Sequence, residues 1–156
     1  MCIRLGCALT RDLGYNTTNQ NLDHSVVLRS AFCYSPINSF FGEIRVLNIH
    51  PGSPNDKIIL TFDILRIEND SNLDLEAVSY KWGSPEGEHR IQLDDQLFIV
   101  TSSQMKMIQD LRDLNRIHRV WIDALCINQK NVSERNQQVQ LMRKVFRNSQ
   151  WRPYLA

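Results

Sequence analysis

The chain lacks any apolar run that could span a bilayer, which takes about eighteen or more consecutive apolar residues. Its N-terminus is interrupted by Arg4, Arg11 and Asp12 before the apolar core of a signal peptide could form. Both absences argue against a membrane-spanning or secreted protein. We therefore expect a cytoplasmic protein with no membrane span.

Net charge and cysteine are also scarce. The formal net charge is +1 and no dense run of Lys and Arg is present, so no field draws in nucleic acid or an anionic membrane. The cysteines, Cys2, Cys7, Cys33 and Cys126, are too scattered for a secreted disulfide framework, and no His completes a zinc site with the first two. We expect structural thiols, no bound metal and no nucleic-acid partner.

Glycine-rich phosphate-binding loops are missing as well. Gly83 and Gly87 lack the spacing and the following Lys of a P-loop, and no Gly-x-Gly-x-x-Gly is present. No local pattern indicates a Ser/His/acid or Cys/His set either. P-loop nucleotide hydrolysis is therefore not expected, and neither is a cofactor.

What is present is the composition of one globular domain, with 156 residues, 42% hydrophobic and 22% charged. Residues 1–40 combine weak apolar clusters with a polar run at residues 16–21 and show no periodicity. This predicts a poorly ordered leader. The domain itself is expected at residues 41–150, followed by an unmatched tail at residues 151–156.

Strand patterns dominate the first half of that domain. Residues 90–100 predict a hairpin, because the turn acids Asp94 and Asp95 tolerate positive φ better than most residues. Further strands are expected from apolar, β-branched runs at residues 44–47, 58–67 and 75–80.

Helical patterns follow. One of the hydroxyl residues 101–103 can cap a first helix. Residues 120–122 predict a buried strand. Asn131 and Glu134 have the spacing of a capping box, which opens a second helix. Helices that alternate with strands predict an α/β fold, a partly parallel sheet with flanking helices. The residues expected to face the core are Met107, Ile108, Leu111 and Leu114 on the first helix, and Val139, Met142, Val145 and Phe146 on the second.

The most informative stretch is residues 121–129, which read Trp-Ile-Asp-Ala-Leu-Cys-Ile-Asn-Gln, an apolar run that carries an acid and ends in two side-chain amides. It predicts a strand running into a specialised loop. Upstream, residues 77–83 read Ala-Val-Ser-Tyr-Lys-Trp-Gly, and downstream residues 134–142 read Glu-Arg-Asn-Gln-Gln-Val-Gln-Leu-Met. These ordered blocks closely resemble the heterokaryon-incompatibility (HET) domain of filamentous fungi, and weaker similarity extends over residues 43–148.

This resemblance implies a doubly wound, flavodoxin-like sheet similar to Toll/interleukin-receptor-type domains. It also implies an interaction and effector module for self/non-self recognition, which triggers growth arrest and programmed cell death when genetically different hyphae fuse. Protein partners or self-association are expected. The family continues from its last helix into a strand ending in Trp-Leu-Gly, whereas residues 149–156 here read Ser-Gln-Trp-Arg-Pro-Tyr-Leu-Ala. We therefore expect the C-terminal part to be missing, and a non-functional fragment is one interpretation.

A second hypothesis is enzymatic. Toll/interleukin-receptor-type relatives include glycohydrolases that cleave nicotinamide from NAD through an oxocarbenium-like transition state, which a carboxylate can stabilise. Glu134 and Asp123 are the candidate catalytic acids, and NAD would be the substrate. Neither residue lies in a motif that matches those enzymes residue by residue, so the interaction hypothesis is favoured.

Each candidate residue also has a structural interpretation. Asp123 ends a strand and can accept hydrogen bonds from the next loop, while Glu134 can satisfy free N–H groups in the first turn of a helix. Cys126 lies between apolar neighbours, which raise a thiol pKa and argue against a nucleophile. Arg135 either pairs with Asp123 or faces water. The other candidates for ligand binding or loop architecture are Ser79, Tyr80, Trp82, Gly83, Asn128 and Gln129.

Overall fold

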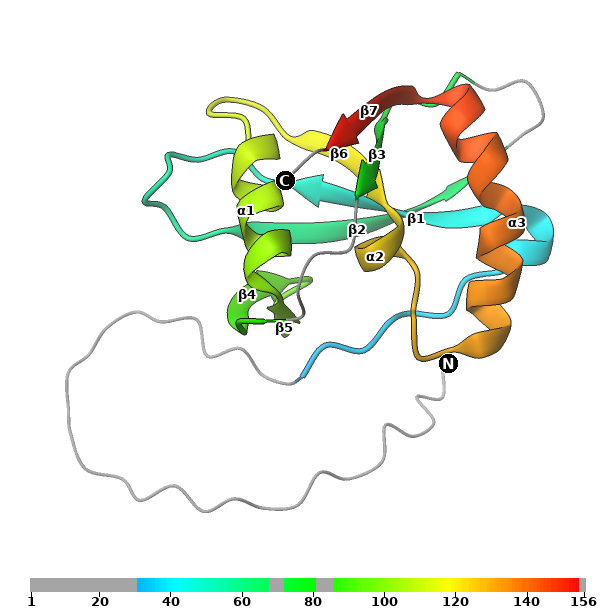
Figure 1. The fold of residues 1–156 in the computed structure, drawn as a ribbon, viewed down its shortest axis with the longest axis horizontal. Coiled ribbons are helices and arrows are strands. Elements are labelled where there is room, and N and C mark those ends of the chain that lie inside the picture. The colour runs from blue at the N-terminus through cyan, green and yellow to red at the C-terminus, as the bar shows by residue number, and fades with distance from the viewer. Residues whose placement is uncertain (1–30, 68–71, 81–85, 155–156) are drawn as a thin grey trace, which may run out of the picture.

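The computed structural model describes residues 31–67, 72–80 and 86–154. Within them lies one mixed, seven-stranded sheet with the order β5-β4-β2-β1-β6-β3-β7 (Figure 1). The fold class is therefore α/β with a partly parallel sheet. The strands are β1 (Glu43–Ile49), β2 (Ile59–Arg66), β3 (Glu76–Tyr80), β4 (His89–Leu93), β5 (Gln96–Val100), β6 (His118–Ile122) and β7 (Gln150–Tyr154). The helices are the 3₁₀ turn η1 (Ser39–Phe41), α1 (Ser102–Leu111), α2 (Asp123–Cys126) and α3 (Val132–Asn148).

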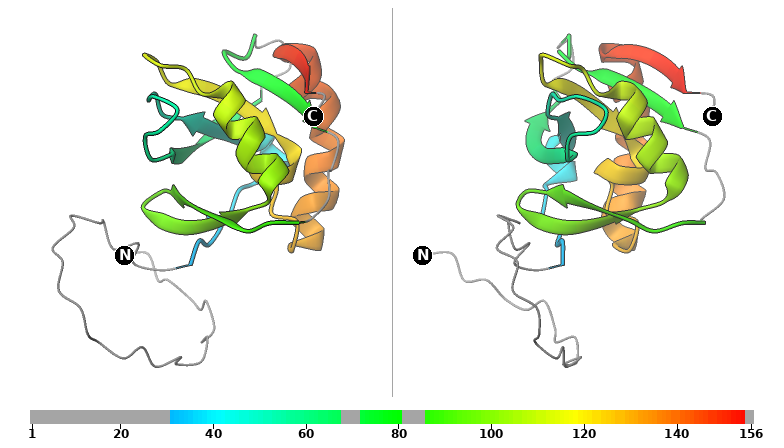
Figure 2. Two further views of the ribbon diagram at one scale, coloured as in Figure 1. Left: turned by 60° about the vertical axis from the view of Figure 1, so that its left-hand side comes forward. Right: turned by 90° about the vertical axis from the view of Figure 1, so that its left-hand side faces the viewer.

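Strand direction divides the sheet into two parts. β3 pairs in parallel with β6 and β7, whereas β1 pairs antiparallel with β2 and β6. β4 is parallel to β2 and antiparallel to β5. Figure 2 shows the β4–β5 hairpin at one end of the sheet and β3 with β7 at the other. The parallel group β6-β3-β7 gathers three strand carboxyl ends at one edge, which is where α/β sheets bind ligands.

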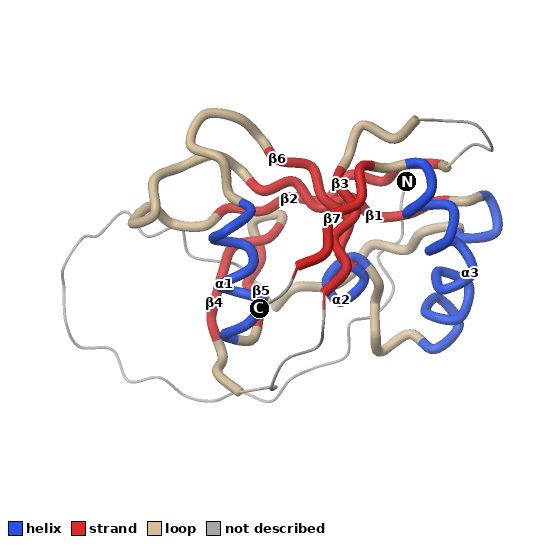
Figure 3. The backbone as a smooth tube through the Cα atoms, turned by 45° about the horizontal axis from the view of Figure 1, so that its top comes forward, coloured by secondary structure: helices blue, strands red, loops and turns tan. Residues whose placement is uncertain are grey.

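The helices lie around the central strands. Figure 3 shows α1 and α3 on either side of them, with the short α2 between. α2 contacts β1, β3 and β6, and α3 contacts η1 and β7. Among the described residues, every helix is too short or too polar to cross a membrane.

The core is centred on β1 and β6. Every residue of β1 after Glu43 is buried, and Val120, Trp121 and Ile122 of β6 are fully buried. The Trp121 ring meets the Phe146 ring of α3 edge to face, with 5.7 Å between centroids. The apolar density of residues 120–122 predicts this buried strand, and the structure confirms it.

Turn and cap chemistry follow the sequence. Asp94 and Asp95, between β4 and β5, adopt φ values of 48° and 60°, in the left-handed region that Asp tolerates. A capping box opens α1: the Gln104 N–H donates to Thr101 Oγ1 at 3.3 Å, and the Thr101 N–H donates to Gln104 Oε1 at 2.9 Å. Both exchanges satisfy N–H groups that the first helical turn leaves free.

Two residues predicted to face the core do not. Leu114 is 63% exposed because α1 already ends at Leu111. Val139 is 54% exposed because α3 presents its neighbour Gln138 to the interior, where the side-chain amide is fully buried and donates to the Glu43 carbonyl at 2.7 Å. Apolar periodicity assigns only apolar side chains to the buried face of a helix. It therefore does not predict that the Gln138 amide lies on the buried face of α3.

Arg112 follows the last residue of α1 and organises the loop between β1 and β2. Gly52 lies against its guanidinium, and a Cβ at that position would collide with the group, which explains the glycine. The guanidinium donates at 2.9–3.2 Å to the backbone carbonyls of His50, Pro51, Ser53, Asp56 and Lys57.

Residues 31–40, which the sequence assigns to the leader, contact the sheet. The Phe32 N–H donates to the Leu97 carbonyl of β5 at 2.9 Å. Its ring lies 5.9 Å from that of Phe62 and 5.0 Å from that of Phe98. Aromatic packing holds residues 31–40 against the sheet, although their sequence has neither helical nor strand periodicity. A prediction based on periodicity therefore assigns these residues to the leader. Residues 1–30 lie outside the described part of the chain.

The segment expected as an unmatched tail, residues 151–156, contains most of β7. β7 pairs with β3 along its whole length, from Gln150 opposite Glu76 to Tyr154 opposite Tyr80. The Tyr154 hydroxyl donates to Asp110 Oδ2 of α1 at 2.6 Å. The sequence predicts that the strand after the last helix is missing. The structure has a strand, β7, directly after α3.

Candidate functional site

Residues 123–129, which we term the signature loop, leave the sheet at the carboxyl end of β6. Ile122, the last residue of β6, pairs with Val78 of β3. The next positions along the chain are Asp123, the first residue of α2, and Ser79 of β3. Ser79 is exposed and Asp123 is half-buried. Tyr80 ends β3, while Trp82 and Gly83 lie outside the described residues.

Asp123 anchors the start of the loop. Its Oδ1 accepts the Ala124 N–H at 2.7 Å, and its backbone carbonyl accepts the Ile127 N–H at 3.3 Å and the Gln129 side-chain amide at 2.9 Å. Burial raises the pKa of the Asp123 carboxyl above its usual value, and the hydrogen bond from Ala124 opposes that rise. Gln129 therefore closes the loop back onto its first residue.

The middle of the loop is buried. Cys126 has no solvent exposure, and its sulfur accepts the Ile122 N–H at 3.4 Å. Burial raises the pKa of this thiol to about 12, so a thiolate is not available near neutral pH. Asn128 turns the chain outward, because its side-chain oxygen accepts the Lys130 N–H at 3.2 Å and its carbonyl accepts the Asn131 N–H at 3.0 Å.

Glu134 holds the end of the loop through a buried ion pair with Arg45 of β1. The two side chains are 8% and 2% exposed, and both carboxylate oxygens are engaged, Oε1 with Nη1 at 2.6 Å and Oε2 with Nη2 at 3.1 Å. Oε1 also accepts the Asn128 N–H at 2.9 Å, and the Glu134 N–H donates to Asn131 Oδ1 at 3.1 Å. A bidentate, charge-assisted pair of this kind is strong and directional.

Arg45 connects this pair to two other segments. Its guanidinium donates to the Cys126 carbonyl at 3.1 Å and to the Ser35 carbonyl at 2.5 Å, and lies 4.8 Å from the centre of the Tyr34 ring. The Tyr34 hydroxyl donates to the Leu125 carbonyl at 2.8 Å. Burial is the main reason that the pKa of Tyr34 rises above its usual value.

The two candidate acids thus differ in what they can do chemically. Both oxygens of Glu134 are committed to Arg45, and the side chain is buried. Asp123 is half-buried, and within the described residues its carboxylate makes one hydrogen bond, through Oδ1. Arg135 is exposed and forms no ion pair with Asp123 in the part of the chain that the structure describes. No group of His, Cys, Asp and Glu in that part could hold a metal ion.

Comparison with known proteins places these residues in a family. The model of the family described as "Heterokaryon incompatibility protein (HET)" matches residues 75–153, which is half of the chain. The chain belongs to the HET family. Heterokaryon incompatibility protein 6, OR allele, of Neurospora crassa is 31% identical over 118 residues, which cover 66% of this chain and 17% of that protein. No solved structure matches the chain.

The HET match contains the signature loop and Glu134, whereas Arg45 and Tyr34 lie before residue 75. Sequence reasoning therefore named Glu134 but missed the residues that bind it. One signal was available: Arg45 interrupts the apolar run of residues 44–47, and a charge in a buried strand requires a counter-charge. Gln138 carried no such signal, because amides are common on exposed helix faces.

Replacing Asp123 with Asn in this HET domain should raise stability at neutral pH. Burial raises the folded-state pKa of Asp123, so the ionised carboxylate destabilises the fold above that pKa. The penalty shrinks as pH falls through the folded-state pKa and is gone below the unfolded value of about 3.9. Asparagine keeps the oxygen that accepts the Ala124 N–H. Urea unfolding at neutral and acid pH measures the difference, which should be a modest gain at neutral pH that vanishes in acid. A variant less stable at both pH values would contradict this reasoning.

Proposed function

We propose that this chain is a signalling module of heterokaryon incompatibility, which acts in the cytoplasm of a filamentous fungus. In this proposal it works through protein contacts or self-association. It triggers growth arrest and cell death when genetically different hyphae fuse, and so takes part in self/non-self recognition. Membership of the HET family and the similarity to heterokaryon incompatibility protein 6 support the proposal.

The main observation in favour of an interaction module is that the Glu134 carboxylate is bound by another side chain of the protein. Of the two candidate acids it opens α3 beside the signature loop, yet both of its oxygens bind the buried Arg45. Catalysis requires an acid or base within reach of a substrate atom. An acid that joins β1, the loop and α3 favours a role in shaping the surface that partners contact.

The proposal includes a finer fold assignment, a sheet of the flavodoxin-like, Toll/interleukin-receptor type. The parallel group β6-β3-β7 supports this assignment, because α2 and α3 connect β6 to β7 as a crossover between parallel strands. The signature loop would then lie at the edge of the sheet that such folds use for recognition.

Inducible expression in a filamentous fungus tests the proposed function. Hyphae that accumulate the chain should stop growing and take up a dye that living cells exclude. A Trp121→Ala variant, in which a fully buried aromatic side chain of the core is removed, serves as the destabilised control and should arrest growth less than the wild-type chain. Normal growth of hyphae that contain the folded wild-type chain would overturn the proposal and favour a non-functional fragment.

A second candidate function is the cleavage of nicotinamide from NAD. The half-buried Asp123, whose pKa is raised by burial and which lies at the carboxyl ends of parallel strands, favours it. Purified protein incubated with NAD should release no nicotinamide if the chain acts by contact alone. Release that disappears in Asp123→Asn or Glu134→Gln while the variant stays folded would establish the enzymatic function instead.

A further inference from the structure

The most exposed large apolar side chain of the described residues, Phe40, lies beside a second exposed phenylalanine in the same turn. Phe40 and Phe41 of η1 are 88% and 53% exposed. Their rings meet edge to face, with 5.5 Å between centroids and 80° between planes. A contiguous exposed aromatic surface is costly in water and is typical of protein interaction sites.

The backbone of this turn is held firmly although its rings point outward. The Phe41 N–H donates to the Asn38 carbonyl at 3.1 Å, and the Gly42 N–H donates to the Ser39 carbonyl at 3.0 Å. From α3, the buried Gln138 side chain donates to Ser39 Oγ at 2.9 Å. Fixing a surface before a partner arrives lowers the entropy cost of binding. The two rings are therefore presented in a prepared arrangement.

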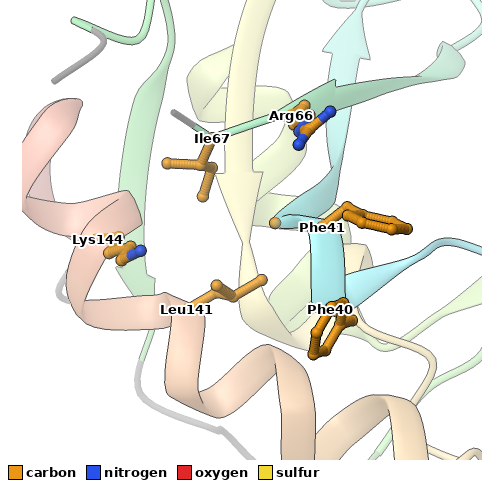
Figure 4. A pocket seen from close by; sticks show the side chains of 7 residues that line it. Phe40, Phe41, Arg66, Ile67, Leu141 and Lys144 are labelled. Atoms are coloured by element: carbon orange, nitrogen blue, oxygen red, sulfur yellow. The ribbon is translucent and has the colours of Figure 1, made fainter. Parts of the chain in front are cut away.

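A pocket of about 390 Å³ lies beside the rings. Figure 4 shows Leu141 pointing from α3 toward the turn, with Ile67 on the opposite wall. Arg66 and Lys144 also line it, and the Arg66 guanidinium lies 5.5 Å from the centre of the Phe41 ring. Among the described lining residues two carry positive charge and none carries negative charge. Four apolar side chains and two basic ones thus line the pocket.

We propose that this pocket docks a segment of a partner protein in which a large apolar side chain is flanked by carboxylates. The apolar side chain would fill the space between Phe40 and Leu141, and the carboxylates would meet the Arg66 guanidinium beside the Phe41 ring. Complementary charges at the rim give specificity to such contacts. The net charge of +1 gives no field for a polyanion such as nucleic acid. The inference rests on the proposed function, in which the chain acts through protein contacts, and names the chemistry of the partner.

Binding of an array of synthetic peptides to the purified full chain tests this inference. Each peptide carries one tryptophan or leucine flanked by glutamates, by lysines or by serines. The glutamate peptides should bind about tenfold more tightly than the lysine peptides, which corresponds to about 1.4 kcal/mol. Arg66→Glu should reverse that preference, and Phe40→Ser should weaken binding of all apolar peptides. Phe40 is too exposed for its loss to unfold the chain.

Two exposed positions away from the pocket serve as matched controls. Val132→Ser removes another exposed apolar side chain, and Arg90→Glu on β4 changes net charge by the same amount as Arg66→Glu. Neither should alter peptide binding. Equal binding of the three peptide sets, or unchanged binding by Phe40→Ser, would overturn the inference. A wild-type chain that binds no peptide and sediments as a dimer, while Phe40→Ser sediments as a monomer, would identify a second copy as the occupant and would also overturn it.

The two proposals can fail separately. Peptide binding is measured with purified protein, whereas growth arrest is measured in hyphae. Arrest without any peptide binding would leave the proposed function standing and remove the docking site. Glutamate-dependent binding without arrest would leave the docking site and remove the proposed function.

Discussion

Replacing Glu134 with glutamine is expected to lower the free energy of unfolding by about 3–5 kcal/mol, because it leaves a buried arginine without its counter-charge. Arg45 is 2% exposed and binds both Glu134 oxygens. Glutamine has nearly the same shape and keeps the oxygen that accepts the Asn128 N–H. The loss therefore reports the charge and not the packing. Urea unfolding of the wild type and the variant measures it.

A double-mutant cycle separates the pair from its surroundings. Arg45→Met should destabilise the fold by a similar amount, since it strands the Glu134 carboxylate and leaves the Cys126 and Ser35 carbonyls without a donor. The double variant Arg45→Met/Glu134→Gln contains no buried charge at this place, so its loss should be clearly smaller than the sum of the two single losses. Strictly additive losses would show that the two side chains act independently, contrary to the geometry.

Trp121→Ala should also cost about 3–5 kcal/mol, through loss of a buried aromatic side chain and the cavity it leaves. Trp121 is fully buried in β6, which lies between β1 and β3, and it packs against Phe146 of α3. Thermal unfolding followed by circular dichroism measures the shift. Leu114→Ala, at a 63% exposed position, is the matched control and should leave the melting temperature nearly unchanged. A cooperatively folded Trp121→Ala variant that melts at the wild-type temperature would contradict the assignment of β6 as the central buried strand.

Features governed by neighbouring residues could be predicted from the sequence. The positive φ angles of Asp94 and Asp95, the cap at Thr101 and the buried strand at residues 120–122 depend on local chemistry and periodicity. The class of the fold follows from the alternation of these elements. The family resemblance carried by the signature loop added the function hypothesis, which periodicity alone does not contain.

Features that depend on long-range contacts could not be predicted. Arg45 and Glu134 are 89 positions apart, and nothing in the local sequence indicates that β1 passes beside the signature loop. The same holds for Gln138, whose partners lie in and beside the turn that carries Phe40. Residues 31–40 were assigned to the leader because they lack periodicity, yet their rings pack on β2 and β5. In each case, contacts between segments far apart in the sequence determine whether a residue is buried and what it binds, and the local sequence does not contain that information.

The central claim is that Glu134 acts through the fold and not through chemistry, and growth arrest by the variants of the Arg45–Glu134 pair tests it most directly. Each form is expressed in hyphae, and its folded fraction is measured in the same extracts by limited proteolysis. Arrest should follow the folded fraction in all three variants, with no further loss of arrest in those that lack the Glu134 carboxylate. A double variant that is as well folded as the wild type but causes no arrest would contradict the claim and assign Glu134 a role beyond the architecture of the loop.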